Sequence, residues 1–360
     1  MKKLGIILVA YRQRPYVAPL LKSLAQTIDL AQTVIWAVDN ASPDGTADEF
    51  EEQALALGLP LRLIRSDENL GFMRGNNVGY AALQKETPCE IVALLNIDTV
   101  AHPGWWEALQ EEIRDSAVGT AASLLLLPDG TVNSRGNALH FLGLGFVRDY
   151  GAAVDALPQS GAGMFFGSCA AIAFRAETME ALNRRFGTDA IFWNELFIYA
   201  DDSDLGWRMR LAGYENRLVA ASRVTHDHRF WVDGLEAAGK KLLYLERNRY
   251  LLLLAYFKVP TLILLLPWIA ASELALGLGV WKLYPRRIHL WREVLKAVRE
   301  PGFSARRRNV QAGRTVRDHS ILCAMTGSIR HGAMPFRGLD RLLDAGLRWS
   351  HRLLCLLVQW

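Results

Sequence analysis

The sequence contains few cysteines and no paired cysteine motif. Its four cysteines, Cys89, Cys169, Cys323 and Cys355, lie far apart, and no two of them form a CxxC pair. This spacing argues against a disulfide framework and a zinc site, and it is typical of reduced thiols in a cytoplasmic protein. With 360 residues, 51% of them hydrophobic and 22% charged, the chain is globular rather than disordered, and its length allows about two domains.

The glycine-rich phosphate loops of two large enzyme classes are also missing. Neither GxGxxG nor the Walker A sequence occurs, since Gly143-Leu144-Gly145 lacks the third glycine. A dinucleotide oxidoreductase and a P-loop enzyme are therefore disfavoured. Residues 4–10 are at the short limit for a signal peptide and run into polar residues 11–14 without a small-residue cleavage site, so we expect them to form a first buried strand.

The first 230 residues alternate between short apolar runs and helix-like segments. The apolar runs are residues 4–10, 33–38, 61–64 and 91–95, and two of the helical patterns are 16–26 and 47–57. This alternation predicts an α/β domain with a mainly parallel sheet. Ligands of such sheets bind beyond the carboxyl ends of the strands, so the polar residues that follow each run are candidates for a site.

Four polar segments follow these runs. They begin at Tyr11, at Asp39 (DNASPDG), at Asp67 (DENLGF) and at Asn96 (NIDT). Any one of them is an ordinary turn, because Asn, Asp, Ser, Pro and Gly are the usual turn residues. Four such segments at one sheet edge indicate a binding site.

Further along, three carboxylates, Asp201, Asp202 and Asp204, crowd into four positions ahead of a helical run. A structural interpretation is available: Asp201 or Asp202 caps the helix, Asp204 forms a surface i,i+4 ion pair with Arg208, and Gly213 supplies a left-handed stop. A chemical interpretation is available too, because a positioned carboxylate can act as a general base.

Positive charge is concentrated at the C-terminal end. Residues 301–360 contain ten arginines, no lysine and three aspartates, a net charge of +7, which leaves −3 for residues 1–300. Such a segment binds nucleic acid or anionic lipid, or is simply a solvated helical surface. The apolar stretch beside it, residues 250–281, favours an anionic membrane surface, and no nucleic-acid partner is expected.

Residues 260–285 are long enough to cross a bilayer, but they contain Pro267, Glu273 and Lys282, and a carboxylate near the middle is costly in hydrocarbon. We expect an in-plane or re-entrant helical anchor, with a span over 261–284 and a helical pair packed on the protein's own core as alternatives. The expected organisation is a catalytic domain (1–235), a hydrophobic membrane-associating helical region (236–300) and a basic helical tail (301–360).

Four motifs, in this order, resemble family 2 glycosyltransferases, and more narrowly their bacterial rhamnosyltransferase-like branch. The motifs are VDNASPDGT from Val38, NLGFMRGNNVGY from Asn69, LLNIDT from Leu94 and the acidic segment at Asp201. The resemblance covers about residues 4–250. It implies the GT-A fold, a nucleoside-diphosphate-sugar donor, a divalent cation, and inverting transfer by a single displacement. Because the QxxRW sequence of processive synthases is absent, one sugar per encounter is expected.

The resemblance assigns donor contacts to residues of these motifs. Asp39 corresponds to the nucleotide-base contact, and Tyr11 lies where the first-strand loop meets the nucleoside. Arg12 stands where many relatives have asparagine, which leaves the contact at that position open. The further donor-side candidates are Asn69, Asn77 and Asn96.

The metal ligands follow from the same resemblance. Asn96-Ile97-Asp98 occupies the position of the DxD motif, so Asp98 is the stronger ligand candidate. His226 stands where relatives place a histidine that completes the metal site, and His228 is the alternate. The hard oxygen ligand of Asp98 suits Mg²⁺ or Mn²⁺, with the donor phosphates completing the coordination shell.

The acidic segment corresponds to the Glu-Asp-x-Asp motif of the family, with Asp201 in place of the glutamate and Asp202 aligned with the catalytic base. Arg208 is expected to pair with an acid and to be structural. The candidates for contacts on the acceptor side are Asp201, Gly167, Ser168 and Trp207.

These inferences predict an inverting, metal-dependent, non-processive transferase for cell-surface polysaccharide synthesis. The donor suggested by the resemblance is dTDP-rhamnose, although nothing in the sequence separates rhamnose from galactose, glucose, galactofuranose or N-acetylhexosamine. The expected acceptor is a lipid-linked saccharide, and the expected location is the cytoplasmic face of the bacterial inner membrane, as a peripheral or monotopic protein. There are two alternative functions. One is a nucleotidyltransferase, which is disfavoured because residues 11–15 form no glycine- and lysine-rich phosphate loop. The other is a noncatalytic membrane-bound scaffold on the same fold.

Overall fold

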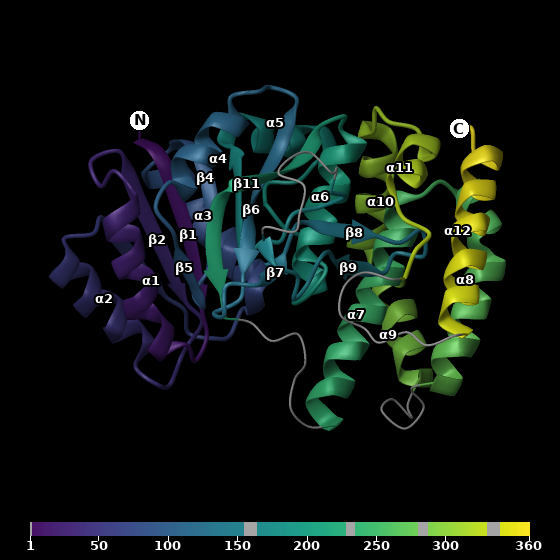
Figure 1. The fold of residues 1–360 in the computed structure, drawn as a ribbon, viewed down its shortest axis with the longest axis horizontal. Coiled ribbons are helices and arrows are strands. Elements are labelled where there is room, and N and C mark those ends of the chain that lie inside the picture. The colour runs from purple at the N-terminus through teal and green to yellow at the C-terminus, as the bar shows by residue number, and fades with distance from the viewer. Residues whose placement is uncertain (1, 155–163, 228–234, 280–286, 330–338) are drawn as a thin grey trace.

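The computed structural model describes residues 2–154, 164–227, 235–279, 287–329 and 339–360. A mixed sheet runs through the N-terminal part in the strand order β3-β2-β1-β4-β10-β6-β11-β5, with β7 paired to β6. Helices pack on both faces of this sheet, and helices α7 to α12 stand together at the opposite end of the molecule from α1 and α2 (Figure 1).

The N-terminal half of the sheet is parallel, as predicted. Its strands are β1 (Lys2–Ala10), β2 (Thr33–Asp39), β3 (Leu61–Arg65) and β4 (Cys89–Asn96). Its helices are α1 (Arg14–Thr27), α2 (Thr46–Leu57) and α3 (Gly71–Glu86). In β1, Ile6 and Leu8 belong to one core cluster and Ile7 and Val9 to the other. Burial on both faces explains why this strand is a continuous apolar run.

Beyond β4 the sheet is mixed, so the prediction of a mainly parallel sheet holds in part. β11 (Glu215–His226) runs parallel to β6 (Val118–Leu126), whereas β10 (Ala171–Arg175) runs antiparallel to both β4 and β6, and β11 runs antiparallel to β5 (Thr99–Ala101). Short strands, rather than a crossover helix, lie between β6 and β10 in the described chain, so the chain can return in the opposite direction. The remaining elements of this part are α4 (Trp105–Ile113), β7 (Val132–Ser134), β8 (Asn137–Leu139), β9 (Gly145–Val147), α5 (Ala176–Phe186), η2 (Asn194–Leu196) and α6 (Asp201–Leu211).

The C-terminal helices share a core with the sheet. They are α7 (Leu235–Tyr256), α8 (Val259–Gly279), α9 (Arg287–Arg299), α10 (Pro301–Gly313), α11 (Asp318–Ala324) and α12 (Leu339–Leu357). Leu251, Leu253 and Tyr256 of α7 are fully buried and join the cluster that also contains Trp207. For α7, packing on the protein's own core therefore replaces the expected membrane association.

Helix α8 contacts α7 through the carboxylate of Glu273. Glu273 pairs with Arg249 of α7 at 3.3 Å and accepts a hydrogen bond from the Tyr250 hydroxyl. The Glu273 carboxylate, which would be costly in hydrocarbon, is thus paired with Arg249 inside the protein. Among the described helices, none is long and apolar enough to cross a membrane.

The basic tail is less exposed than its composition suggests. Arg306 pairs with Asp204 at 2.6 Å, and Arg314 pairs with Asp318 at 2.5 Å. Arg307 donates hydrogen bonds to backbone carbonyls near the C-terminal end of α7. For these three arginines the expected solvated or lipid-facing role is wrong, because they satisfy buried acceptors.

Candidate active site

The carboxyl ends of adjacent parallel strands meet at one edge of the sheet. In the strand registers, Asp39 at the end of β2 lies opposite Ala10 of β1, and Asn96 at the end of β4 lies opposite Val9. Tyr11 follows Ala10 directly and is exposed. The structure therefore brings Tyr11, Asp39 and Asn96 to one edge, where ligands of parallel sheets bind.

Asp39 uses only part of its carboxylate within the protein. Its Oδ2 accepts the Ser42 amide at 3.0 Å, whereas its Oδ1 is buried and has no hydrogen-bond partner in the described part of the chain. The Ser42 hydroxyl in turn accepts the amide of Arg12 at 3.0 Å. Because an unsatisfied buried oxygen is costly, Oδ1 of Asp39 is well suited to accept a hydrogen bond from a ligand.

Asn40 is a site residue to which the sequence assigned no role. Its side chain is buried, and Nδ2 donates to the Gly71 carbonyl at 3.1 Å. Its Oδ1, like that of Asp39, is buried without a partner among the described residues. Its position within the motif that begins at Val38 was the available signal, because it follows Asp39 at the strand end.

Asn69 and Asn77 are bound by the protein itself. Asn69 accepts the Gly71 amide at 2.9 Å, and Asn77 exchanges hydrogen bonds with the backbone of Phe192 at 2.9 and 3.0 Å. Gly71 has φ +75°, and a Cβ there would lie 2.9 Å from the Phe197 carbonyl, so glycine is required for this close approach. Asn77 thus holds α3 against the segment before α6, Asn69 shapes the turn into α3, and the donor contacts of both remain predictions.

Strand pairing places the two predicted metal ligands together. β5 pairs with the end of β11 so that His226 lies opposite Thr99, and the Asp227 amide donates to the Asp98 carbonyl at 2.9 Å. As a result, Nε2 of His226 lies 3.4 Å from Oδ1 of Asp98. His228, the alternate ligand, lies outside the described residues.

The atoms at this position fit a hard divalent cation. Asp98 and His226 supply a carboxylate and an imidazole, and Oδ1 of Asn96 is buried nearby in the chain without a partner among the described residues. Oxygen and imidazole ligands suit Mn²⁺ or Mg²⁺. Among the described residues, Asp98 and His226 are not joined by a third His, Cys, Asp or Glu side chain to form a metal-binding group.

The acidic segment begins α6 in an unexpected conformation. Ala200 precedes the helix with φ +63°, and neither Asp201 nor Asp202 caps the helix by a side-chain hydrogen bond. The prediction that one of them is the cap is wrong, because both lie in the first helical turn. At the other end, Gly213 has φ +91°, which confirms the left-handed stop.

Asp202 is held by two neighbours and is half-buried. Its Oδ1 accepts the Ser203 amide at 2.7 Å, and its Oδ2 accepts Nδ2 of Asn137 at 3.2 Å. Burial, and then the charge of Asp201, raise the pKa of Asp202 well above its ordinary value. Burial also raises the pKa of Asp201 to about 6. Such carboxyl groups take up and release protons closer to neutrality than exposed ones, as general bases must.

A short chain of contacts links this acidic pair to the end of β4. The Cys169 thiol lies close enough to Asp201 to lower the pKa of that carboxyl against the effect of burial, and the carbonyl of the next residue, Ala170, accepts the Asn96 amide at 3.0 Å. Cys169 and Ala170 thus connect Asp201 of α6 to Asn96, at the strand end that leads to Asp98. The sequence offered no signal for Cys169, because its role depends on this contact between distant segments.

Asp204 has a structural role, as predicted, but its ion pair is not on the surface. Asp204 and Arg208 are almost completely buried, and their atoms Oδ2 and Nη2 lie 2.8 Å apart. Asp204 also accepts hydrogen bonds from Tyr256 and from Arg306, the latter at 2.6 Å. Although burial alone would raise the pKa of Asp204, these arginines hold it below its ordinary value.

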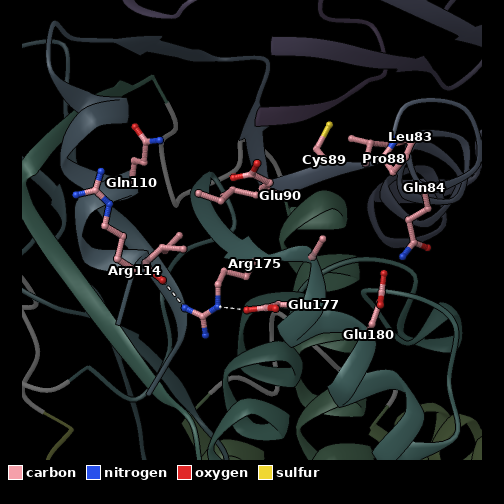
Figure 2. Close-up of a pocket in the computed structure, with 13 residues that line it drawn as sticks. Leu83, Gln84, Pro88, Cys89, Glu90, Gln110, Arg114, Arg175, Glu177 and Glu180 are labelled. Atoms are coloured by element: carbon pink, nitrogen blue, oxygen red, sulfur yellow. Dashed lines mark hydrogen bonds and ion pairs between the residues drawn. The ribbon is translucent and has the colours of Figure 1, made fainter. Parts of the chain in front are cut away.

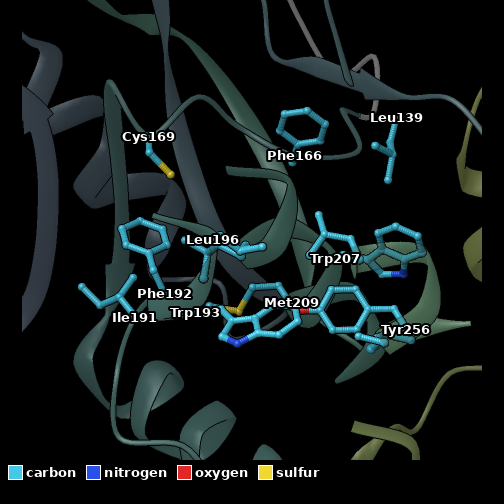
Figure 3. Packing of buried hydrophobic residues seen from close by; sticks show 14 of the residues in the cluster. Leu139, Phe166, Cys169, Ile191, Phe192, Trp193, Leu196, Trp207, Met209 and Tyr256 are labelled. Atoms are coloured by element: carbon cyan, nitrogen blue, oxygen red, sulfur yellow. The ribbon is translucent and has the colours of Figure 1, made fainter. Parts of the chain in front are cut away.

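The acceptor-side prediction fails for Trp207. Its side chain is 0% exposed and packs edge to face against Phe165, Tyr256 and Phe257 in the core (Figure 3). The helix turns Asp204, Trp207 and Arg208 inward together, since they are three and four positions apart. A side chain in the core cannot reach an acceptor.

Gly167 and Ser168 directly precede Cys169 in the chain. Gly167 is buried, and a Cβ there would lie 2.4 Å from Cβ of Ala122, so the glycine allows close packing. Ser168 is half-buried, and its hydroxyl accepts the Ala170 amide at 3.3 Å. Packing explains Gly167, while an acceptor contact of Ser168 remains a prediction.

A cavity of about 500 Å³ lies at the opposite edge of the sheet. It is lined by Cys89 and Glu90 at the start of β4 and by Arg175 at the end of the antiparallel strand β10 (Figure 2). Arg175 donates to the carbonyls of Asp115, Ser116 and Val118, which ties down a loop. This cavity is therefore separate from the predicted site, and Arg175 is structural.

Comparison with known proteins agrees with this geometry. Residues 5–178, just under half of the chain, match the family model described as "Glycosyl transferase family 2". No curated protein matches the sequence.

Solved structures share the fold at low sequence identity. GalNAc-T7 with UDP, GalNAc and Mn²⁺ superposes with a TM-score of 0.54 at 12% identity over 72% of this chain and 49% of that one. The mannosyltransferase PcManGT from Pyrobaculum calidifontis, with GDP-Man and Mn²⁺, gives 0.51 at 16% identity over 86% and 85%. S. aureus TarS gives 0.53 at 16% identity over 97% and 55%. The chain thus spans about half of GalNAc-T7 and of TarS.

These similarities indicate a GT-A-like fold with a mixed sheet and leave the narrower rhamnosyltransferase-like branch as an expectation. Residues 5–178 are therefore similar in sequence to a family 2 glycosyltransferase domain.

Proposed function

We propose that the protein is an inverting, metal-dependent, non-processive glycosyltransferase that moves one sugar from a nucleoside-diphosphate donor to an acceptor hydroxyl. The observation that supports this best is the link from Asp201 through Cys169 and Ala170 to Asn96. Through these contacts, two half-buried carboxylates with raised pKa values, Asp201 and Asp202, are linked to the strand end that carries the predicted donor and metal residues. A base, a donor platform and a metal position are the parts that such a transfer requires.

In this mechanism Asp202 accepts the proton of the acceptor hydroxyl as its oxygen attacks the anomeric carbon. The bond between that carbon and the diphosphate breaks, and the nucleoside diphosphate leaves with the bonding electrons. Asn137 and Ser203 orient the Asp202 carboxylate through the hydrogen bonds that they donate. Asp98 and His226, with Asn96, would hold Mg²⁺ or Mn²⁺, which neutralises charge on the leaving diphosphate.

On the donor side, Oδ1 of Asp39 accepts a hydrogen bond from the nucleoside, and Tyr11 packs against it. We propose dTDP-rhamnose as the donor because the motifs resemble the rhamnosyltransferase-like branch, with another hexose or galactofuranose as the alternatives. The similar structures were solved with UDP or GDP-Man, so their titles support a nucleoside diphosphate rather than one particular base.

The proposed acceptor is a lipid-linked saccharide at the cytoplasmic face of the bacterial inner membrane. Helix α12 supports this location, because five large apolar side chains on it are 50–73% exposed: Leu342, Leu343, Trp349, Leu356 and Leu357. Helix α8 exposes Val259, Ile263 and Leu266 at helical spacing, and the Trp360 indole donates to the Thr261 hydroxyl at 2.9 Å. Exposed Arg341 and Arg352 on α12 suit anionic headgroups.

A donor screen tests the proposed function. Purified protein with Mn²⁺ is incubated with each common nucleotide sugar, and release of nucleoside diphosphate is measured with and without a lipid-linked acceptor. We expect release with one donor, strongest for dTDP-rhamnose, and stimulation by the acceptor. Absence of release with every donor would favour the noncatalytic scaffold instead.

A further inference from the structure

The loop that leads into α6 adopts a conformation that its residues do not favour. Phe197, Tyr199 and Ala200 have φ values of +66°, +62° and +63°. Left-handed backbone is uncommon for residues other than glycine, and it persists where the surrounding structure fixes it. Asp201 and Asp202 follow this loop directly, so whatever fixes the loop also fixes the start of α6.

Asn248 of α7 fixes this loop. Its side chain is fully buried, and its single amide group donates to the carbonyls of Leu196, Ile198 and Tyr199 at 3.1, 2.9 and 3.0 Å. The three acceptors lie across the left-handed segment. An aspartate of the same shape would present an oxygen to these carbonyls, which repel it.

Arg306 of α10 fixes the first turn of α6 from the other side. Its Nη2 donates to Oδ1 of Asp204 at 2.6 Å and to the Tyr256 hydroxyl at 2.8 Å. Its guanidinium also lies over the ring of Trp193, 4.3 Å from the centroid. Arg306 therefore joins α10 to α7, to the segment before α6 and to α6 itself.

We propose that Asn248 and Arg306 are positioning residues for the catalytic carboxylates, so that the C-terminal helices complete the active site. Neither residue touches the reacting atoms. They act by holding the left-handed loop and the first turn of α6 in the arrangement that presents Asp202 to the acceptor. The inference rests on the proposed role of Asp202, and it extends the active site to residues of helices α7 and α10.

Paired variants separate positioning from general stability. Asn248→Asp is compared with Asn309→Asp, an exposed asparagine on α10, and Arg306→Met with Arg308→Met, an exposed arginine two positions along. Arg306→Lys keeps the charge and serves as the conservative variant. Each protein is assayed for kcat, for donor KM and for its thermal unfolding midpoint.

We expect kcat to fall about a hundredfold in Asn248→Asp and in Arg306→Met, because small displacements of a catalytic group have effects of this size. Donor KM should stay within about twofold. Arg306→Lys should recover part of kcat, and both control variants should match the wild type. If folded Asn248→Asp and Arg306→Met keep wild-type kcat, or if kcat falls only in proportion to lost folded protein, the inference is wrong.

Hydrogen exchange gives a readout that does not depend on turnover. In Asn248→Asp the amides of residues 197–204 should exchange faster than in the wild type, while those of β1 and β4 keep their protection. Unchanged protection of residues 197–204 would overturn the inference. If protection is lost but the wild type turns over no donor, the proposed function fails and the structural part of the inference stands.

Discussion

Buried polar groups differ between the sheet edge that carries Tyr11, Asp39 and Asn96, here called the donor edge, and the contacts of the C-terminal helices with α6. At the donor edge, oxygens of Asp39, Asn40 and Asn96 are buried without partners in the described chain. Around α6, by contrast, Asp204 has Arg208, Tyr256 and Arg306 as partners, and Asn248 donates to three carbonyls. The oxygens of Asp39, Asn40 and Asn96 are therefore suited to accept hydrogen bonds from a ligand, whereas the bonded groups of Asp204 and Asn248 are suited to position the start of α6.

The largest effect on the donor edge is expected from Asp98→Ala. Loss of the carboxylate should lower kcat/KM by about a thousandfold, because Asp98 is a proposed ligand of the metal that would stabilise the leaving diphosphate. Nucleoside diphosphate release, measured over a Mn²⁺ titration, checks this. Asp67→Ala, an exposed carboxylate in a neighbouring loop, is the control, and a wild-type Mn²⁺ dependence in Asp98→Ala would contradict the metal site.

The pH dependence of kcat tests the acidic pair. The base must be ionised to accept a proton, and burial raises the pKa of Asp201 to about 6 and that of Asp202 above its ordinary value. Activity should therefore fall about tenfold per pH unit below an apparent pKa near or above 6, rather than near 4. A kcat that stays constant down to pH 5, in protein still folded there, would exclude this pair as the base.

Asp39→Asn should have a smaller effect, confined to donor binding. Replacing one carboxylate oxygen by an amide weakens a charged hydrogen bond, so we expect donor KM to rise about tenfold with kcat unchanged. Titration of nucleoside diphosphate onto the protein measures the same change without turnover. Equal binding by Asp39→Asn and the wild type would remove Asp39 from the donor site.

The smallest effect on chemistry is expected on α12. Leu342→Glu with Leu356→Glu places two charges on its exposed apolar face, and should abolish flotation with anionic liposomes while leaving transfer to a water-soluble acceptor unchanged. Gln359→Glu, also exposed on this segment, is the control. Flotation of the double variant at the wild-type level would place the membrane contact elsewhere.

Features that depend on local sequence patterns could be predicted from the sequence. Strands β1 to β4 and helices α1 and α2 follow from local apolar patterns, and Tyr11, Asp39 and Asn96 follow from the rule that such strands end at one edge. Asp98 and His226 were paired through the family resemblance, and the pairing of β5 with β11 brings them together.

Residues whose roles depend on distant contacts were missed or misassigned. Asn137, Cys169, Asn248 and Arg306 act on α6 from other elements, and no local pattern identifies them. Trp207 was assigned to the acceptor side by its place in a motif, whereas the turn of α6 directs it into the core. The ten arginines of the tail were counted as surface charge, although Arg306, Arg307 and Arg314 satisfy internal acceptors.

The account depends most on Asp202 as the base that acts on a donor held elsewhere. The direct measurement is sugar transfer and nucleoside diphosphate binding on the same Asp202→Asn protein, in which the carboxylate is lost and the shape is kept. We predict that transfer falls by about a thousandfold or more while binding stays within about twofold. Transfer at the wild-type rate would contradict the account.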